Sequence, residues 1–162
     1  MRLLRRIRQF LTAGVRPTPA DLQFAREILP PPLYALFASQ TPRDIVHGVR
    51  TARRVRELGY DDPALLMAAL LHDIGKGRQR RLDRVAYVVA TWFGAAHLLA
   101  SPSSRLELRR AVARSCTHAE AGARLAAEAG APPRVVALIR RHHGPARGDA
   151  MLAVLQRADD ES

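Results

Sequence analysis

The sequence is almost free of cysteine: Cys116 is the only one in 162 residues. One thiol cannot form an internal disulfide, which fits a reducing compartment. A metal cage built from several thiolates is excluded for the same reason. We expect Cys116 to be a buried side chain without a chemical role.

Long apolar runs are also missing, since no segment reaches the roughly 18 to 20 uninterrupted apolar residues that span a bilayer. Arginines interrupt the N-terminal sequence MRLLRRIRQFL too often for the apolar stretch of a secretory signal. Residues 85–100 are apolar nearly all round but short, and they include Gly94 and His97. We expect a buried helix there, and a soluble, cytoplasmic protein with no transmembrane segment.

Acidic residues are outnumbered, and the formal net charge is +11. This excess indicates an anionic partner: a phosphorylated metabolite, a nucleic acid or an anionic membrane surface. Lysine is nearly absent, because Lys76 is the only lysine among 26 basic residues. A lone lysine in an arginine-rich chain indicates a site that needs a compact, point-like charge, with a solvated lysine at a helix end as the alternative.

No convincing alternating strand pattern occurs, and helix signals dominate the sequence. Capping residues, prolines at the first helical position and one capping-box spacing predict six helix starts. These are Thr18-Pro19, Thr41-Pro42, Asp62-Pro63, His118 within the box from Thr117 to Glu120, Pro132-Pro133, and the helix after Asp149. Gly59 and Gly130 are predicted C-caps, and prolines 30–32 are a predicted stiff corner.

The length fits one domain with a substantial core. We therefore expect an all-α, single-domain helical bundle, with an N-terminal helical extension in residues 1–40 and the main domain in residues 41–162. The basic segment RLLRRIRQF is interpreted as an amphipathic packing helix with a solvated arginine face. Docking on nucleic acid or an anionic membrane is the alternative for this segment.

A histidine and an aspartate, His72 and Asp73, end the apolar run PALLMAALL in the sequence LLHDIGK. On a helix expected over residues 63–74, apolar residues three, four and seven positions earlier place both side chains inward. Burying them costs several kcal/mol unless a partner compensates, so the pair is either a buried hydrogen bond or part of a metal site. Gly75 would let the helix end and so help both side chains reach one ion.

Further candidates follow in the last two predicted helices. His142 lies on the buried stripe of its helix and is a better inward candidate than His143. Asp159 lies on the apolar face of the final turn, where the helix dipole makes a cation favourable, whereas Asp160 is predicted to be solvated. Periodicity does not select His47, and His118 alone would be interpreted as a surface residue.

In their order, these residues resemble the metal ligands of the HD superfamily of metal-dependent phosphohydrolases, specifically its HDIG-type members. The matching positions are His47, His72, Asp73, His118, His142 and Asp159. The resemblance spans about residues 41–161 and is carried by HGVRTA, HDIGK, HAEAGARL, LIRRHHG and LQRADD. It implies an HD-type helical domain.

The resemblance also implies a binuclear site. His47, His72, Asp73 and Asp159 would bind the first metal ion, and Asp73 would bridge to a second. His118 and His142 would hold the second ion, with the choice between His142 and His143 left open. Imidazole and carboxylate ligands suit two divalent ions of iron or manganese, with zinc, nickel or cobalt as alternatives. His97 has no role in this pattern.

For such a site the resemblance implies hydrolysis of a phosphoester or phosphoanhydride by a metal-activated water. Lys76 would neutralise phosphate charge, and Arg50, one turn after His47, either helps or is a surface arginine. The sequence after His143 lacks the Gly-Tyr-Pro signature of cyclic-dinucleotide phosphodiesterases. We therefore expect a nucleotide or dinucleoside polyphosphate as substrate. The alternative is a non-catalytic HD domain that binds an anionic ligand or RNA in a regulatory role.

Overall fold

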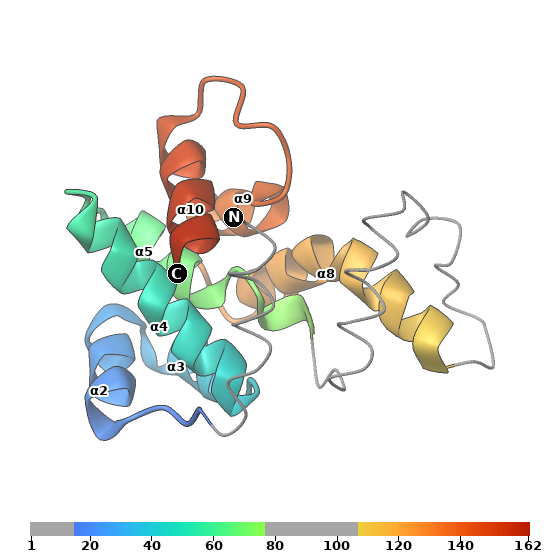
Figure 1. Cartoon of the computed structure of the whole chain (residues 1–162), viewed down its shortest axis with the longest axis horizontal. Helices are drawn as coiled ribbons and strands as arrows, with labels where there is room; N and C mark the ends of the chain where they lie inside the picture. Colours follow the sequence, from blue (N-terminus) through green and yellow to red (C-terminus); the bar gives the residue numbers. More distant parts are fainter. Residues whose placement is uncertain (1–14, 77–106) are drawn as a thin grey trace.

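The computed structural model describes residues 15–76 and 107–162, with the backbone alone for 107–117. This part of the chain is all-α, as predicted, and contains no strand (Figure 1). Its elements in chain order are α2 (Pro19–Ile28), α3 (Pro31–Ala38), α4 (Pro42–Glu57), α5 (Pro63–Leu71), the 3-10 turn η1 (Ile74–Lys76), α8 (Glu107–Glu128), α9 (Pro133–Arg141) and α10 (Ala150–Glu161).

Side-chain caps begin four of these helices, as the sequence predicts. Thr18, Thr41, Asp62 and Asp149 are the N-caps of α2, α4, α5 and α10, and each side chain accepts a hydrogen bond from a backbone N–H three residues later. A cap of this kind contributes about 1 kcal/mol. The predicted start of α9 at Pro133 is also confirmed. Gly59 and Gly130 have φ angles of 88° and 83°, the left-handed conformation expected just after a helix.

Two local predictions are wrong, and a third is incomplete. The helix expected to start at His118 starts at Glu107, because the upstream residues are good helix formers without glycine or proline, and a Thr-x-x-Glu spacing also occurs inside helices. Prolines 30–32 do more than form a corner, since Pro31 begins α3. The helix predicted to run to residue 74 ends at Leu71, and the chain then tightens into η1.

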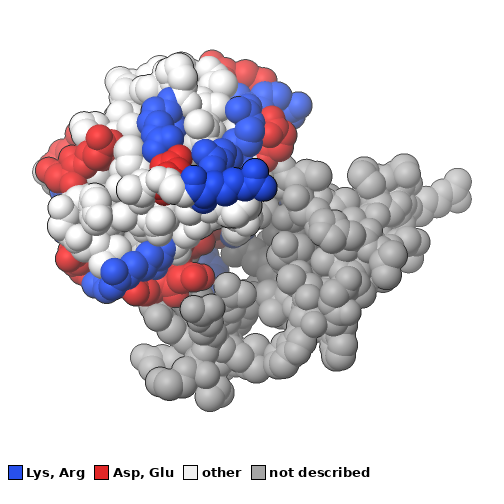
Figure 2. Space-filling model, turned by 90° about the horizontal axis from the view of Figure 1, so that it is seen from above, with Lys and Arg blue, Asp and Glu red and all other residues white. Residues whose placement is uncertain are grey.

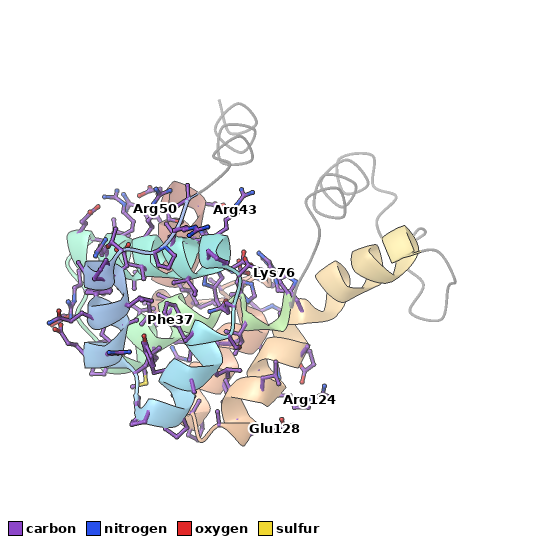
Figure 3. The ribbon with its side chains drawn as sticks, turned by 90° about the horizontal axis from the view of Figure 1, so that it is seen from below. Phe37, Arg43, Arg50, Lys76, Arg124 and Glu128 are labelled. Atoms are coloured by element: carbon purple, nitrogen blue, oxygen red, sulfur yellow. The ribbon has the colours of Figure 1, made fainter. Side chains whose placement is uncertain are left out.

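The core lies around α5, a helix that is buried along most of its length and packs against α2, α4, α9 and α10. Residues from α2 and α3 join the same core: Ala25, Leu33 and Phe37 are at most 1% exposed. Figure 3 shows Phe37 inside the bundle. The N-terminal segment therefore covers one side of the domain, and the boundary between residues 40 and 41 stays a prediction.

Some predictions concern parts of the chain outside the described residues. These are the basic N-terminal helix, the apolar helix at 85–100 with His97, and the burial of the Cys116 side chain. Among the described residues, no helix combines the length and apolarity that crossing a membrane requires.

Candidate metal centre

The pair His72 and Asp73 lies at the junction of α5 and η1. His72 is the C-cap of α5, and Lys76 N–H closes the following turn on the Asp73 carbonyl, with N and O 3.0 Å apart. Neighbouring residues on a regular helix point about 100° apart. Here the chain leaves the α-helix between them, and His72 Nε2 lies 3.5 Å from Asp73 Oδ2. Both side chains are buried, at 1% and 5% exposed.

Gly75 acts by its size. Its φ angle is not positive, so Gly75 does not adopt the left-handed conformation that glycine permits, and α5 has already ended at Leu71. A Cβ at Gly75 would clash with the carbonyl oxygen of His118 and lie 2.5 Å from the Gly122 nitrogen, both backbone atoms of α8. Glycine therefore lets η1 contact the backbone of α8 directly, and this contact brings His118 to Asp73.

One group of ligand atoms joins α4, the α5–η1 junction and α10. His47 Nε2 lies 2.8 Å from Asp159 Oδ1 and 3.8 Å from Asp73 Oδ2. His72 Nε2 lies 3.4 Å from the same Asp159 oxygen. His47, His72 and Asp73 have the proximity required to hold one metal ion. The resemblance selected His47 although its helix periodicity did not, and the structure places its half-buried ring at this group.

A second group lies on the other side of Asp73. His118 Nε2 and His142 Nε2 are 3.6 and 3.9 Å from Asp73 Oδ1, and His143 Nε2 is 3.0 Å from His118 Nε2. His118, His142 and His143 could together hold a metal ion. His142 is 3% exposed and His143 is exposed, yet both belong to this group, so the choice between them as ligand stays open. His142 is the C-cap of α9, so the chain leaves the helix there, as it does at His72, and consecutive side chains can reach one place.

Two of the histidine rings are oriented by their own helices. His72 Nδ1 lies 2.9 Å from the Ala69 carbonyl oxygen, and His142 Nδ1 lies 2.6 Å from that of Ile139. A carbonyl can only accept, so each Nδ1 carries the proton and each Nε2 faces the site. His72 Nε2, His142 Nε2 and Asp73 Oδ1 are buried without a hydrogen-bond partner. These atoms can each donate a lone pair to a metal ion, and they converge on one place. Their lack of hydrogen-bond partners therefore fits a metal site.

The pKa values describe a pocket whose carboxylates stay ionised. Burial opposes ionisation of Asp73, yet Lys76, His72 and His47 hold its pKa well below the usual range. Burial also opposes charging of His72, but Asp73 and Asp159 raise the pKa of His72 to about 9. For His142, burial and the neighbouring His72 and His143 lower the pKa to about 3. Ionised carboxylates beside a neutral imidazole favour binding of a cation.

Cation binding should therefore release a proton. Because the pKa of His72 is raised to about 9, His72 is protonated at pH 7 and a cation must displace that proton. Apparent affinity for Mn²⁺ should rise by about tenfold per pH unit between roughly pH 7 and pH 9, then level off. Titration calorimetry in buffers of different ionisation enthalpy measures the release, with about one proton expected at pH 7 from the site that contains His72, because His142 of the other group is already neutral. An affinity independent of pH would contradict this assignment.

The two basic residues that the sequence offers for this centre, Lys76 and Arg50, differ in position. Lys76 contacts Asp73 Oδ2 and is 27% exposed, and Figure 3 shows it at the end of η1 beside α8. Arg50 is exposed, projecting outward from α4 in the same view. Figure 2 shows acidic and basic side chains interspersed over the described part of one face. On that face the described residues form no uniform basic surface for nucleic acid.

Comparison with known families agrees with this geometry. The sequence profile of the HD domain matches residues 45–161, a segment that contains all six predicted metal ligands. No solved structure was found to match the chain. The match covers most of the chain and extends from the helix that carries His47 to the helix that carries Asp159, and the chain therefore belongs to the HD domain family.

Proposed function

We propose that this protein is a metal-dependent phosphohydrolase that cleaves a phosphoester or phosphoanhydride of a nucleotide. The observation that carries the proposal is the position of Asp73, whose two oxygens face two separate groups of histidines in a buried pocket. The orphaned atoms of this pocket need cations, and membership of the HD domain family supports the same reaction class.

We assign one divalent cation to the group on the side of Asp159 and a second to the group on the side of α8. The first set is His47, His72, Asp73 and Asp159, and the second is His118, His142 and His143 with Asp73 shared. Iron or manganese suits these donors best, and zinc, nickel or cobalt would also bind. Two such cations supply positive charge that acidifies a nucleophilic water and offsets the charge of the phosphate.

The chain itself provides the surroundings for this reaction. The buried imidazoles and carboxylates are held by backbone carbonyls and by packing, so they do not reorganise as charge develops. Lys76 contacts Asp73 but is 27% exposed, so a substrate could reach its ammonium group, which would bind an outer phosphate oxygen. We assign it the role of stabilising the charge that accumulates on the phosphate.

A nucleotide is the proposed substrate because the chain carries an excess of positive charge and its small HD domain resembles nucleotide-acting members. Nucleoside mono-, di- and triphosphates and dinucleoside polyphosphates form the panel to test, with the full chain loaded with Mn²⁺ or Fe²⁺. Release of phosphate or of a nucleotide from at least one compound, abolished by a chelator and restored by the metal, is the expected result. Two bound metal ions with no hydrolysis of any compound would instead support a regulatory binding domain.

Replacing Lys76 should separate metal binding from catalysis. In Lys76→Gln the cation beside the phosphate is lost, so we expect kcat to fall by about 10² to 10³. The metal content should stay at two ions, because Lys76 donates no metal ligand. Arg124→Gln is the control, since Arg124 is 72% exposed on α8 and pairs with Glu128 at 3.8 Å. An unchanged kcat in Lys76→Gln would overturn the assigned role.

A further inference from the structure

His47 is oriented differently from the other histidines of the site. His72 and His142 are helix C-caps whose Nδ1 atoms donate to carbonyls three residues earlier. His47 lies inside α4, and its Nδ1 is 3.2 Å from the hydroxyl oxygen of Ser162, which belongs to the far end of the chain. The imidazole that faces Asp159 on one side therefore meets a serine hydroxyl on the other.

The Ser162 hydroxyl is itself held by two neighbours. Its oxygen lies 3.1 Å from the Asp159 carbonyl oxygen and 3.1 Å from Thr51 Oγ1. Thr51 is fully buried on α4, one turn after His47, and its hydroxyl also lies 3.0 Å from the His47 carbonyl oxygen. A buried threonine that could have been valine is thus placed where its hydroxyl reaches Ser162.

One set of hydrogen-bond directions leaves His47 Nε2 free to bind a cation. A hydroxyl has one hydrogen and two lone pairs, and a carbonyl can only accept. When Ser162 donates its hydrogen to the Asp159 carbonyl, its oxygen can accept from the His47 Nδ1–H. Thr51 meanwhile shares its single hydrogen between Ser162 and the His47 carbonyl. The proton of His47 is then on Nδ1, and the Nε2 lone pair faces the Asp159 carboxylate 2.8 Å away. In this tautomer two lone pairs face one another, and a cation bound by both atoms would stabilise the arrangement.

We propose that Ser162, held by Thr51, is a positioning residue that fixes the tautomer and ring orientation of His47 for binding a cation. Asp159 and Ser162 are three residues apart at the end of α10. The same helix turn therefore supplies the proposed metal ligand Asp159 and the hydroxyl that orients His47. This inference rests on the proposed function, because it requires that His47 binds a cation. The rival arrangement has Ser162 donating to Nδ1, which would place the proton on Nε2.

Metal affinity measured without any substrate tests the role. By titration calorimetry with Mn²⁺ on the full chain, Ser162→Ala should raise the dissociation constant of one site by about 10- to 100-fold, the range typical for groups that orient a metal ligand. Ser162→Thr, which retains a hydroxyl, should restore wild-type affinity. Thr51→Val, nearly isosteric with threonine, should weaken the same site, and Thr51→Ser should not.

A second measurement reads the tautomer directly. In Zn²⁺-loaded protein labelled with ¹⁵N-histidine, His47 should carry its proton on Nδ1, and in Ser162→Ala its Nδ1–H should exchange faster with water. Wild-type affinity in both Ser162→Ala and Thr51→Val, or a proton on Nε2 of His47, would overturn the positioning role while leaving the proposed function intact. A wild-type chain that binds no divalent cation would overturn both.

Discussion

Asp73→Ala is expected to lose both bound cations and all measurable hydrolysis. Among the described residues, Asp73 is the only one whose side-chain oxygens face both histidine groups, at 3.8 Å from His47 Nε2 and 3.6 Å from His118 Nε2. Its removal takes one anionic ligand from each proposed cation and leaves the neighbouring imidazoles to repel one another when protonated. Since metal ions supply several kcal/mol of charge stabilisation in such reactions, activity should fall by at least roughly 10³-fold.

Metal content by plasma mass spectrometry and phosphate release by the same protein sample measure the two losses together. Asp73→Asn is the second variant, because it keeps the shape of the side chain and removes its charge. Asp61→Ala is the matched control, since Asp61 is 75% exposed and pairs with Arg56 away from the pocket. A folded Asp73→Ala protein that retained two metal ions and wild-type turnover would show that the site is wrongly assigned.

The loss of Asp73 should also change the free energy of unfolding of the cation-free protein. Asp73 and Asp159 are the groups that raise the pKa of His72 to about 9, so His72 becomes easier to deprotonate when Asp73 is absent. The stability that ionised Asp73 contributes to the wild type is present above the usual aspartate pKa and is lost as pH falls through its depressed value. Thermal unfolding followed by circular dichroism therefore has to accompany the metal analysis of every variant.

Local chemistry made much of the fold predictable from the sequence. Helix starts at Thr18, Thr41, Asp62 and Asp149 depend on a capping side chain and its immediate neighbours, which the sequence states directly. The start of α8 was mispredicted because a capping-box spacing has the same three-residue interval as two neighbours inside a helix. Propensity upstream of His118 decided the outcome, and it outweighs a single motif.

The site was predictable only where burial and periodicity coincide. His72, Asp73 and His142 follow apolar stripes, and all three are buried. His47 does not follow the apolar stripe of α4, because its ring points from α4 toward Asp159 in α10. These two residues are more than one hundred positions apart in the sequence. Only the family resemblance selects His47. The same holds for the Ser162 hydroxyl. Contacts of this kind depend on how helices pack, and no local pattern records them.

The second large effect on metal binding and turnover is expected from replacing Gly75. Gly75→Ala places a methyl group against the backbone of α8, where it would clash with the His118 carbonyl oxygen and lie 2.5 Å from the Gly122 nitrogen. Backbone atoms cannot rotate away as a side chain does, so η1 must separate from α8. Overpacking of this kind costs about 1 to 3 kcal/mol. The separation should move His118 away from Asp73 and empty one cation position while the other stays filled.

We therefore expect Gly75→Ala to bind one metal ion in place of two and to lose at least about 10²-fold in turnover, comparable to removing one electrostatic stabiliser. Gly130→Ala is the matched control: its left-handed φ of 83° makes alanine unfavourable by about 1 to 2 kcal/mol, yet nothing lies within 4 Å of the new methyl group. It should lower thermal stability to a similar degree and leave both metal ions and turnover unchanged. Two bound ions with normal turnover in Gly75→Ala would mean that the contact between η1 and α8 does not hold the second half of the site. A loss of metal ions and turnover in Gly130→Ala as well would mean that general destabilisation, and no specific displacement of His118, explains the effect.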